Sequence, residues 1–370
     1  MSKFEFPCTI FYIDSLDLWV HNITVARPIQ PQKILITGSA GFIGGYLVQE
    51  FLDRGHTVIG IDNYSKYGKV KKSYDNHPNY KLYVHDVKDT KFLTKIVKDC
   101  DYIVALAAMI GGITYFHKFA YDLLAENERI MASTFDAAIE AHKNGKLKKI
   151  VVLSSSMVFE STNVYPTPEN VLNNTPSPKS TYGFQKLATE YFCKGAWEQY
   201  QLPYTILRPF NCVGIGEKRA KNEVEIKSGN VKLAMSHVVP DLVQKVLAGQ
   251  DPLHILGKGN QIRCYTYGAD LAKGIVTATF SPKAKNEDFN LSTNEATSVL
   301  QLAKAIWKKI NGNKPFHYVS GEAFTYDVQK RIPDTSKAKK MLGYEAKTTL
   351  DQMLDEAIPW IKEQVKLGGI

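Results

Sequence analysis

The chain has 370 residues, of which 44% are hydrophobic and 22% charged, as in a globular protein with one large domain or two unequal lobes. No apolar run approaches the roughly 18 residues of a membrane-spanning helix. The first residues also lack the continuous apolar core of a signal peptide. We therefore expect a cytoplasmic protein that does not bind membranes.

The formal net charge is +9, from 46 basic and 37 acidic side chains. Such a charge favours an anionic ligand, for example a nucleotide diphosphate, although lysines on solvated helix faces account for most of it. No stripe of basic and aromatic residues indicates nucleic-acid binding. The five cysteines have neither zinc-site nor disulfide spacing, so we expect buried thiols and no metal: Cys8, Cys100, Cys193, Cys212 and Cys264.

Residues 1–32 precede the first predicted strand and end in the proline-containing segment 27–32. We treat them as an N-terminal extension of unknown role, with a possible small hairpin around Thr9–Ile13.

Strands and helices then alternate along the chain, which predicts a parallel sheet with helices on both faces. The predicted strands are 33–37, 57–62, 80–84, 101–106, 149–153 and 203–208. The predicted helices between them are 42–54, 89–98, 119–143 and 181–200.

The alternation ends after Arg208-Pro209, where a stretch rich in glycine and lysine (214–229) precedes a helix near 238–249. From about residue 295 the chain is predicted to be mostly helical, to near Trp360. We expect an α/β fold with a doubly wound parallel sheet and a smaller, mostly helical C-terminal substrate lobe. The sheet domain would comprise 33–211 with 263–292, and the lobe 212–262 and 293–370.

The most informative segment is Ile34–Gly44, an apolar run that ends in three glycines spaced three apart and is followed by a helical pattern. A strand that leads through such a turn into a helix N-terminus can bind a pyrophosphate with its backbone. The next strand ends at Asp62, and a carboxylate there suits the ribose hydroxyls of NAD and repels the extra phosphate of NADP. The order of these elements predicts NAD as the cofactor.

Tyr182 and Lys186 form a second motif, because residues four apart share one face of a helix. A phenol is a weak base at neutral pH, but a nearby ammonium group and oxidised nicotinamide favour the phenolate. Ser155, at the end of the fifth strand, could bridge a sugar hydroxyl and Tyr182. We therefore predict Ser155, Tyr182 and Lys186 as the catalytic residues.

From about residue 33 almost to the C-terminus, the chain resembles the extended short-chain dehydrogenase/reductase family, in particular its nucleotide-sugar epimerases and dehydratases. The resemblance rests on the glycine motif, Asp62, Asp86-Val87, Leu106–Ala108, the Ser155 segment, Tyr182/Lys186, Leu207–Asn211, Arg263 in 261–270 and Arg331 in 330–334. It implies a bound NAD, with Asp62 on the ribose and Asp86-Val87 beside the adenine. The implied cofactor residues are Gly38, Gly41, Phe42, Ile43, Gly44, Asp62, Asn63, Asp86, Val87, Leu106, Ala107, Ala108, Asn127, Tyr182, Lys186 and Pro209.

The resemblance also implies a nucleoside-diphosphate sugar as substrate and a homodimer formed through helices 119–143 and 181–200. Guanidinium groups suit diphosphate oxygens, which agrees with the implied roles of Arg263 and Arg331. The implied substrate residues are Met109, Gly111, Gly112, Ser156, Asn211, His237, Arg263 and Arg331.

The residues after Ser155 bear on the reaction. Within the family that the chain resembles, 4,6-dehydratases carry an Asp-Glu pair at these two positions. UDP-glucuronate decarboxylases carry a glutamate at the second position, and GDP-mannose 3,5-epimerases carry a cysteine there. This chain has Ser156-Met157. C4 epimerisation through a 4-keto sugar needs none of these groups, so by elimination it is the first hypothesis.

Alternatives stay open. Gly111-Gly112 resembles the glycine pair that lines the sugar pocket of the GDP-mannose 3,5-epimerase. Lys218 aligns loosely with the catalytic lysine of that enzyme. Proton transfer of that kind, reduction of a 4-keto sugar and a non-catalytic NAD-binding protein are the other hypotheses.

Overall fold

The computed structural model describes residues 30–110, 118–217, 224–231, 237–322 and 328–369. All of these except Gln30 belong to one compact unit, Pro31–Ile370. The hairpin expected near Thr9–Ile13 lies outside the described residues.

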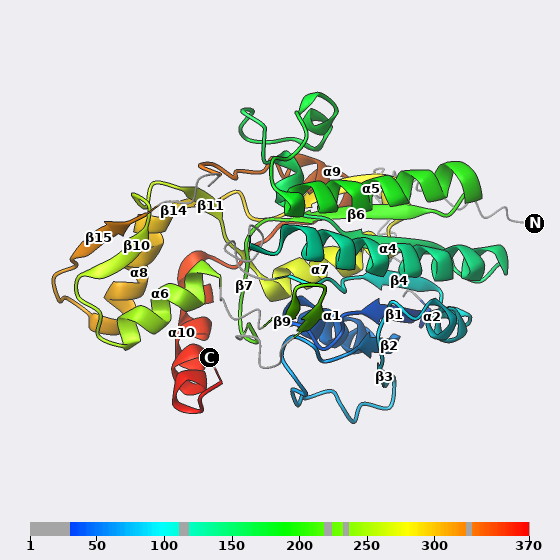
Figure 1. Cartoon of the computed structure of the whole chain (residues 1–370), viewed down its shortest axis with the longest axis horizontal. Helices are drawn as coiled ribbons and strands as arrows, with labels where there is room; N and C mark the ends of the chain where they lie inside the picture. The colour runs from blue at the N-terminus through cyan, green and yellow to red at the C-terminus, as the bar shows by residue number, and fades with distance from the viewer. Residues whose placement is uncertain (1–29, 111–117, 218–223, 232–236, 323–327, 370) are drawn as a thin grey trace, which may run out of the picture. The chain divides into compact units, whose positions relative to one another are not determined.

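Among the described residues, seven parallel strands form the central sheet in the order β3-β2-β1-β4-β5-β6-β13 (Figure 1). The order reverses at β1, which lies between β2 and β4, and ligands of such sheets bind beyond the strand ends at this reversal. The predicted doubly wound fold is confirmed. The strands are β1 (Lys33–Thr37), β2 (Thr57–Asp62), β3 (Tyr80–Val84), β4 (Tyr102–Ala105), β5 (Lys149–Leu153), β6 (Tyr204–Pro209) and β13 (Glu287–Leu291).

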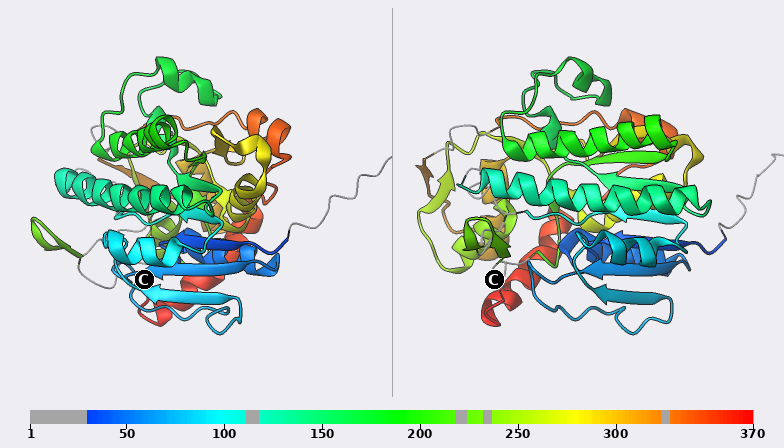
Figure 2. Two further views of the ribbon diagram at one scale, coloured as in Figure 1. Left: turned by 90° about the vertical axis from the view of Figure 1, so that its right-hand side faces the viewer. Right: turned by 45° about the vertical axis from the view of Figure 1, so that its right-hand side comes forward.

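Helices cover both faces of the sheet because alternate side chains of each strand point to opposite faces. Ile34 and Ile36 of β1 pack with α1 (Phe42–Asp53) and α7 (Gly268–Phe280). Leu35 packs on the other face with α2 (Thr90–Val97), α4 (Ala120–Lys143) and α5 (Thr181–Tyr200). Figures 1 and 2 show α4 and α5 side by side on that face. Each predicted helix of this region is present, with ends within one residue of those expected.

A separate hydrophobic core forms in the C-terminal half of the chain. It contains Leu242 of α6 (Val238–Leu247), Ile306 of α8 (Val299–Asn311) and Leu354 of α10 (Leu350–Lys366). These helices lie together in Figure 1. The mostly helical C-terminal part is confirmed, although it continues to Lys366, beyond Trp360. The domain boundaries given above stay predictions.

Short elements that the sequence analysis did not predict complete the described structure. Two-residue to four-residue strands pair far along the chain: β7 (Cys212–Val213) with β12 (Thr266–Tyr267), β10 (Leu253–Leu256) with β15 (Tyr318–Gly321), and β11 (Ile262–Cys264) with β14 (Ala296–Ser298). The others are η1 (Ser156–Phe159), η2 (Glu169–Asn174), β8 (Val224–Ile226), β9 (Gly229–Val231), η3 (Pro282–Ala284) and α9 (Ser336–Leu342).

Candidate functional site

The glycine turn between β1 and α1 requires its small residues. Gly38 has φ +71°, and a Cβ atom there would lie 2.9 Å from the Ala107 Cα. A Cβ atom on Gly44 would lie 2.3 Å from the Gly38 carbonyl oxygen. Among the described residues, no side chain caps α1 at Gly41, so its first backbone N–H groups are available to an anion.

Asp62 lies at the end of β2 and braces the same turn. Its carboxylate accepts hydrogen bonds from the backbone N–H of Ala40 at 3.1 Å and of Tyr64 at 2.8 Å. Burial raises the pKa of Asp62, and these two bonds and the charge of Lys72 oppose that rise. The side-chain amide of Asn63 donates a hydrogen bond to the carboxylate of Asp86. Asp86 follows β3 and is predicted to lie beside the adenine.

Two side chains shape the loop after β4. The Thr37 hydroxyl oxygen accepts from the N–H groups of Leu106 and Ala107, both at 3.1 Å. The buried amide of Asn127 accepts from the Met109 N–H at 2.8 Å and donates to its carbonyl oxygen at 2.9 Å. In this structure Asn127 therefore positions the loop, and its direct contact with a cofactor stays a prediction.

A cavity of about 490 Å³ lies beyond the strand ends. Met109 and His237 line it, together with most of the predicted cofactor residues. Those cofactor residues are Gly38, Gly41, Phe42, Ile43, Gly44, Asp62, Asn63, Asp86, Val87, Leu106, Ala107 and Ala108. Asn127, Tyr182, Lys186 and Pro209 are not among its lining residues. The loop Tyr64–Gly68 also lines the cavity, and the sequence analysis missed it. Its position shortly after Asp62 was the signal that could have predicted this.

The N-terminus of α5 fixes the predicted catalytic pair. The Ser180 hydroxyl accepts from the Gly183 N–H at 3.0 Å and donates to Glu160 at 2.8 Å, so the helix begins at Thr181. Tyr182 and Lys186 then share a face, with the Lys186 Nζ 6.0 Å from the Tyr182 ring centre. That Nζ donates to the Leu153 carbonyl oxygen at 3.2 Å, which ties α5 to the end of β5.

Ser155 completes the catalytic group. It is buried, and its hydroxyl lies near enough to the Tyr182 phenol to lower the pKa of that phenol. The same hydroxyl oxygen accepts from the Met157 N–H at 3.2 Å. The structure thus brings Ser155, Tyr182 and Lys186 together, as the sequence motifs predicted.

Burial has the largest effect on the pKa values of Tyr182 and Lys186. It raises the pKa of Tyr182, whereas the hydroxyl of Ser155 and the charge of Arg331 act to lower it. Burial lowers the pKa of Lys186 to about 8, and the charge of Glu128 on α4 opposes that fall. Burial also raises the pKa of Glu128, and one of its carboxylate oxygens is buried with no hydrogen-bond partner among the described residues. Glu128 was missed because only the packing of α4 against α5 brings it near Lys186.

The predicted diphosphate-binding arginines lie on adjacent segments. The Arg331 N–H donates to the Ile262 carbonyl oxygen at 3.0 Å, next to Arg263. The charges of both arginines lower the pKa of the buried Tyr265, although burial raises that pKa overall to about 12. Asn211, just after β6, donates from its side chain to the Cys264 carbonyl oxygen at 3.4 Å. Arg263, Arg331 and Asn211 therefore lie around one short segment, 262–265.

Of the other predicted substrate residues, Met109 and His237 line the cofactor cavity, away from the segment 262–265. Ser156 is buried at the start of η1, next to the buried and apolar Met157. His237 precedes α6 and contacts the buried Glu217. Gly111, Gly112 and Lys218 lie outside the described residues.

The match to known proteins covers most of the chain. Residues 34–292 match the NAD dependent epimerase/dehydratase family. The chain belongs to this family. Its glycine turn, Asp62 and cavity fit the cofactor of the family, so NAD is the cofactor of this protein as well. The resemblance to extended short-chain dehydrogenases/reductases is thereby confirmed.

Similar members of the family carry out different reactions. The UDP-N-acetyl-alpha-D-glucosaminuronate decarboxylase of Bacillus cytotoxicus is 29% identical over 90% of this chain and 98% of its own. The UDP-glucose 4-epimerase of Lactobacillus helveticus is 26% identical over 90% and 98%. The crystal structure of UDP-glucuronic acid 4-epimerase from Bacillus cereus, with UDP-glucuronic acid and NAD, has a TM-score of 0.75 at 27% identity and covers 90% of this chain and 99% of its own.

Two further findings concern the described residues alone. None of their helices is both long and apolar enough to cross a membrane. No group of their histidine, cysteine and acidic side chains could hold a metal ion. Cys100, Cys193 and Cys264 are buried free thiols and Cys212 is half-buried, while Cys8 lies outside the described part.

Proposed function

We propose that this protein catalyses NAD-dependent C4 epimerisation of a nucleoside-diphosphate hexose through a transient 4-keto sugar. The arrangement of Ser155, Tyr182 and Lys186 next to the cofactor cavity carries the proposal. The 4-epimerases among the similar proteins support it.

In the proposed reaction Tyr182 takes the proton of the sugar C4 hydroxyl. Ser155, whose hydroxyl lowers the pKa of the phenol, orients the C4 hydroxyl. NAD supplies a reversible acceptor for the hydride of C4. The ammonium of Lys186 stabilises the phenolate from one turn further along α5. Tyr182 then returns the proton to the new C4 hydroxyl, and hydride returns to the other face of the ketose.

The two residues that follow Ser155 in the chain, Ser156 and Met157, carry no acid or base, which favours this reaction over the alternatives. Met157 is buried and apolar at the position where a decarboxylase would carry a glutamate and a 3,5-epimerase a cysteine. The 3,5-epimerisation hypothesis depends on Gly111-Gly112 and Lys218. The 4-keto reduction hypothesis depends on NADPH, whose extra phosphate the carboxylate of Asp62 would repel. A non-catalytic NAD-binding protein would not need the complete catalytic group.

A homodimer through α4 and α5 is part of the proposal. A groove between these helices is lined mainly by apolar side chains, among them Phe135, Ile139, Leu187 and Phe192. Phe184 and Tyr191 beside it are 48% and 63% exposed. Apolar patches of this kind mark interaction sites.

The test is an incubation of the purified protein with UDP, GDP, CDP and dTDP sugars without added reductant, followed by proton NMR. We expect one sugar to reach an equilibrium with its C4 epimer. A keto product, a loss of CO2, or no change in any sugar would contradict the proposal.

A further inference from the structure

Glu190 extends the face of α5 that carries the catalytic pair. Tyr182, Lys186 and Glu190 follow one another at intervals of four residues. The Glu190 side chain is fully buried, one turn beyond Lys186. A buried carboxylate at this position needs partners, because an ionised group without them would be strongly disfavoured.

One partner of Glu190 is Ser154, the residue before the catalytic serine. The Ser154 hydroxyl donates to the Glu190 Oε1 at 2.6 Å, and the Ser154 N–H donates to the Leu207 carbonyl oxygen on β6 at 2.9 Å. Ser154 is therefore held by both its side chain and its backbone. These bonds fix the backbone that leads into Ser155.

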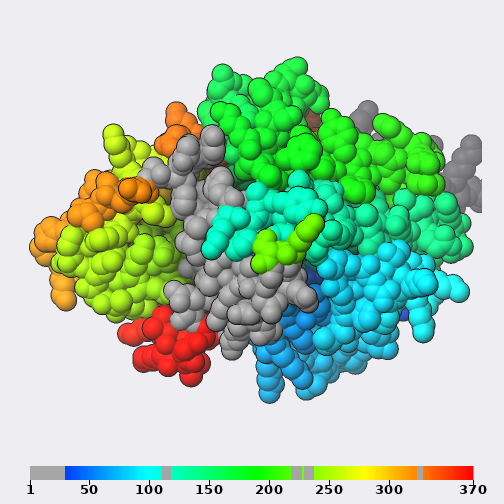
Figure 3. Space-filling view, in the orientation of Figure 1, coloured from blue at the N-terminus to red at the C-terminus, as the bar shows by residue number. Residues whose placement is uncertain are grey.

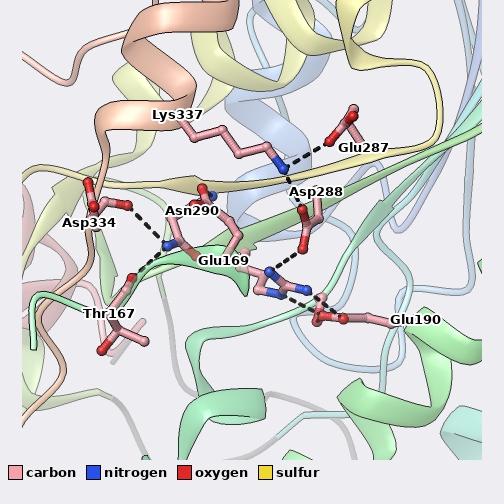
Figure 4. Close-up of polar contacts among 10 residues, drawn as sticks. Thr167, Glu169, Glu190, Glu287, Asp288, Asn290, Asp334 and Lys337 are labelled. Atoms are coloured by element: carbon pink, nitrogen blue, oxygen red, sulfur yellow. Dashed lines mark hydrogen bonds and ion pairs between the residues drawn. The ribbon is translucent and has the colours of Figure 1, made fainter. Parts of the chain in front are cut away.

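The second partner of Glu190 is Arg208 of β6. Its Nε and Nη2 donate to the two Glu190 oxygens at 2.8 Å and 2.7 Å, and its Nη1 lies 2.7 Å from a carboxylate oxygen of Asp288 on β13. Figure 4 shows this chain of contacts continuing to Lys337 of α9. A two-point guanidinium contact fixes the orientation of a carboxylate, so Glu190 presents Oε1 to Ser154 in one geometry.

The same strand anchors the segment that carries a predicted substrate residue. Asn290 of β13 donates from its side chain to the carbonyl oxygens of Thr167 at 3.0 Å and Asp334 at 3.1 Å (Figure 4). Asp334 follows Arg331 by three residues. Strand β13 thus contacts Arg208 through Asp288 and the segment of Arg331 through Asn290.

We propose that Glu190 is a positioning residue for the reaction, which holds Ser154 and thereby sets the Ser155 hydroxyl against Tyr182. The inference rests on the proposed function only in that Ser155 and Tyr182 carry out the chemistry. Stability alone would not require the bond from Ser154, because Arg208 already binds both oxygens of Glu190.

The test compares Ser154→Ala with Thr205→Val. Each substitution deletes one buried hydroxyl that donates at 2.6 Å, from Ser154 to Glu190 or from Thr205 to the Ala284 carbonyl oxygen. Thr205 lies on the same sheet, at the opposite end of β6 from Leu207–Pro209 and away from Ser155. Each variant therefore loses one buried hydroxyl donor, at different distances from the catalytic group, and the bond lost in S154A is the stronger because its acceptor is a carboxylate.

We expect S154A to lower kcat about tenfold or more while KM changes little, because a small misplacement of a reacting group has effects of this size. T205V should keep the wild-type kcat, and S154A should lose more thermal stability than T205V because its lost bond is to a carboxylate. Ser154→Cys, which keeps the volume and replaces the hydroxyl by a weak donor, serves if S154A does not fold. A kcat for S154A equal to that of T205V would overturn the inference.

A second measurement does not depend on turnover. In the NAD-loaded protein, ionisation of Tyr182 is followed as the near-ultraviolet tyrosinate absorbance of each protein minus that of its Y182F partner. The pKa of Tyr182 should rise in S154A, because the hydroxyl of Ser155 acts to lower it, and should not change in T205V. No difference between the two variants would overturn the inference. If the wild type acts on no nucleotide sugar, the proposed function fails and this titration still decides the role of Glu190.

Discussion

The burial of Tyr182 opposes its role as a base, because burial disfavours the charged phenolate. Burial raises its pKa, while Ser155 and Arg331 act in the opposite direction. The ammonium of Lys186 is 6.0 Å from the ring centre. The positive charge of oxidised nicotinamide favours the phenolate as well, so we expect Tyr182 to ionise more readily when NAD is bound.

Tyr182→Phe should lower turnover by at least about 100-fold, because general acid–base catalysis contributes that much or more. The amount of bound NAD should change little, since Tyr182 does not line the cofactor cavity. Initial rates and the NAD released on denaturation measure both quantities. Tyr318→Phe, at an exposed tyrosine of β15, is the matched control. Full turnover of Y182F would assign the base to another residue.

Glu128 should set the alkaline limit of activity. Burial lowers the pKa of Lys186 to about 8, and the Glu128 carboxylate opposes this. In Glu128→Gln the opposing charge is lost, so the pKa of Lys186 falls further and its ammonium is lost at a lower pH. The alkaline limb of the kcat–pH profile should therefore move to lower pH. Among the described residues, Glu128 and Lys186 act on each other, and Ser155 and Arg331 act on Tyr182.

The control for E128Q is Glu140→Gln on the exposed face of the same helix. It makes the same change of carboxylate to amide away from Lys186. An alkaline limb that does not move in E128Q, or that moves equally in E140Q, would rule out this role of Glu128.

At the scale of elements, the turn between β1 and α1 determines cofactor binding. Gly44→Ala would place a Cβ atom 2.3 Å from the Gly38 carbonyl oxygen, which belongs to backbone that cannot move freely. We expect loss of bound NAD and a destabilisation of about 1–3 kcal/mol, as for overpacking elsewhere. Thermal unfolding and NAD content measure these effects.

Gly45→Ala provides the comparison one residue further along α1. Its Cβ atom would meet the terminal nitrogen of the flexible Lys72 side chain, at 3.0 Å, which can move away. G45A should therefore keep NAD. Equal losses in the two variants would mean that a general intolerance of this helix, rather than the close approach at Gly44, explains the effect.

Most elements could be predicted from the sequence because their signals are local. β1 to β6 are apolar runs between turn residues, and the glycine turn and Asp62 follow from their order. The short strands β7, β11 and β12 are two or three residues long and pair with partners that lie about 35–55 residues away, so no local pattern marks them.

The same distinction applies to the site. Ser155, Tyr182 and Lys186 are found by spacing, whereas Thr37, Glu128 and Glu190 act through tertiary contacts that the sequence does not display. The contact of the capping residue Ser180 with Glu160, 20 residues earlier, is another tertiary contact of this kind.

At the scale of the whole molecule, the apolar groove between α4 and α5 bears on assembly. The surfaces of the two helices adjoin on the face shown in Figure 3. Tyr191→Glu would place a charge on this patch, so we expect a dimer in the wild type and a monomer in Y191E. Light scattering at micromolar concentration measures this. Val84→Glu, at an exposed apolar residue on the edge strand β3, should leave the assembly unchanged. A monomeric wild type would contradict the proposed dimer.

The central claim concerns the carbon at which the sugar changes. The most direct measurement is proton NMR of the reaction in D2O with the nucleotide sugar on which the protein acts. Since hydride leaves and returns at C4 without exchange with water, we predict a C4 epimer with no deuterium on the sugar carbons. Deuterium at C3 or C5, or a product that has lost its carboxylate or retains a keto group, would contradict C4 epimerisation.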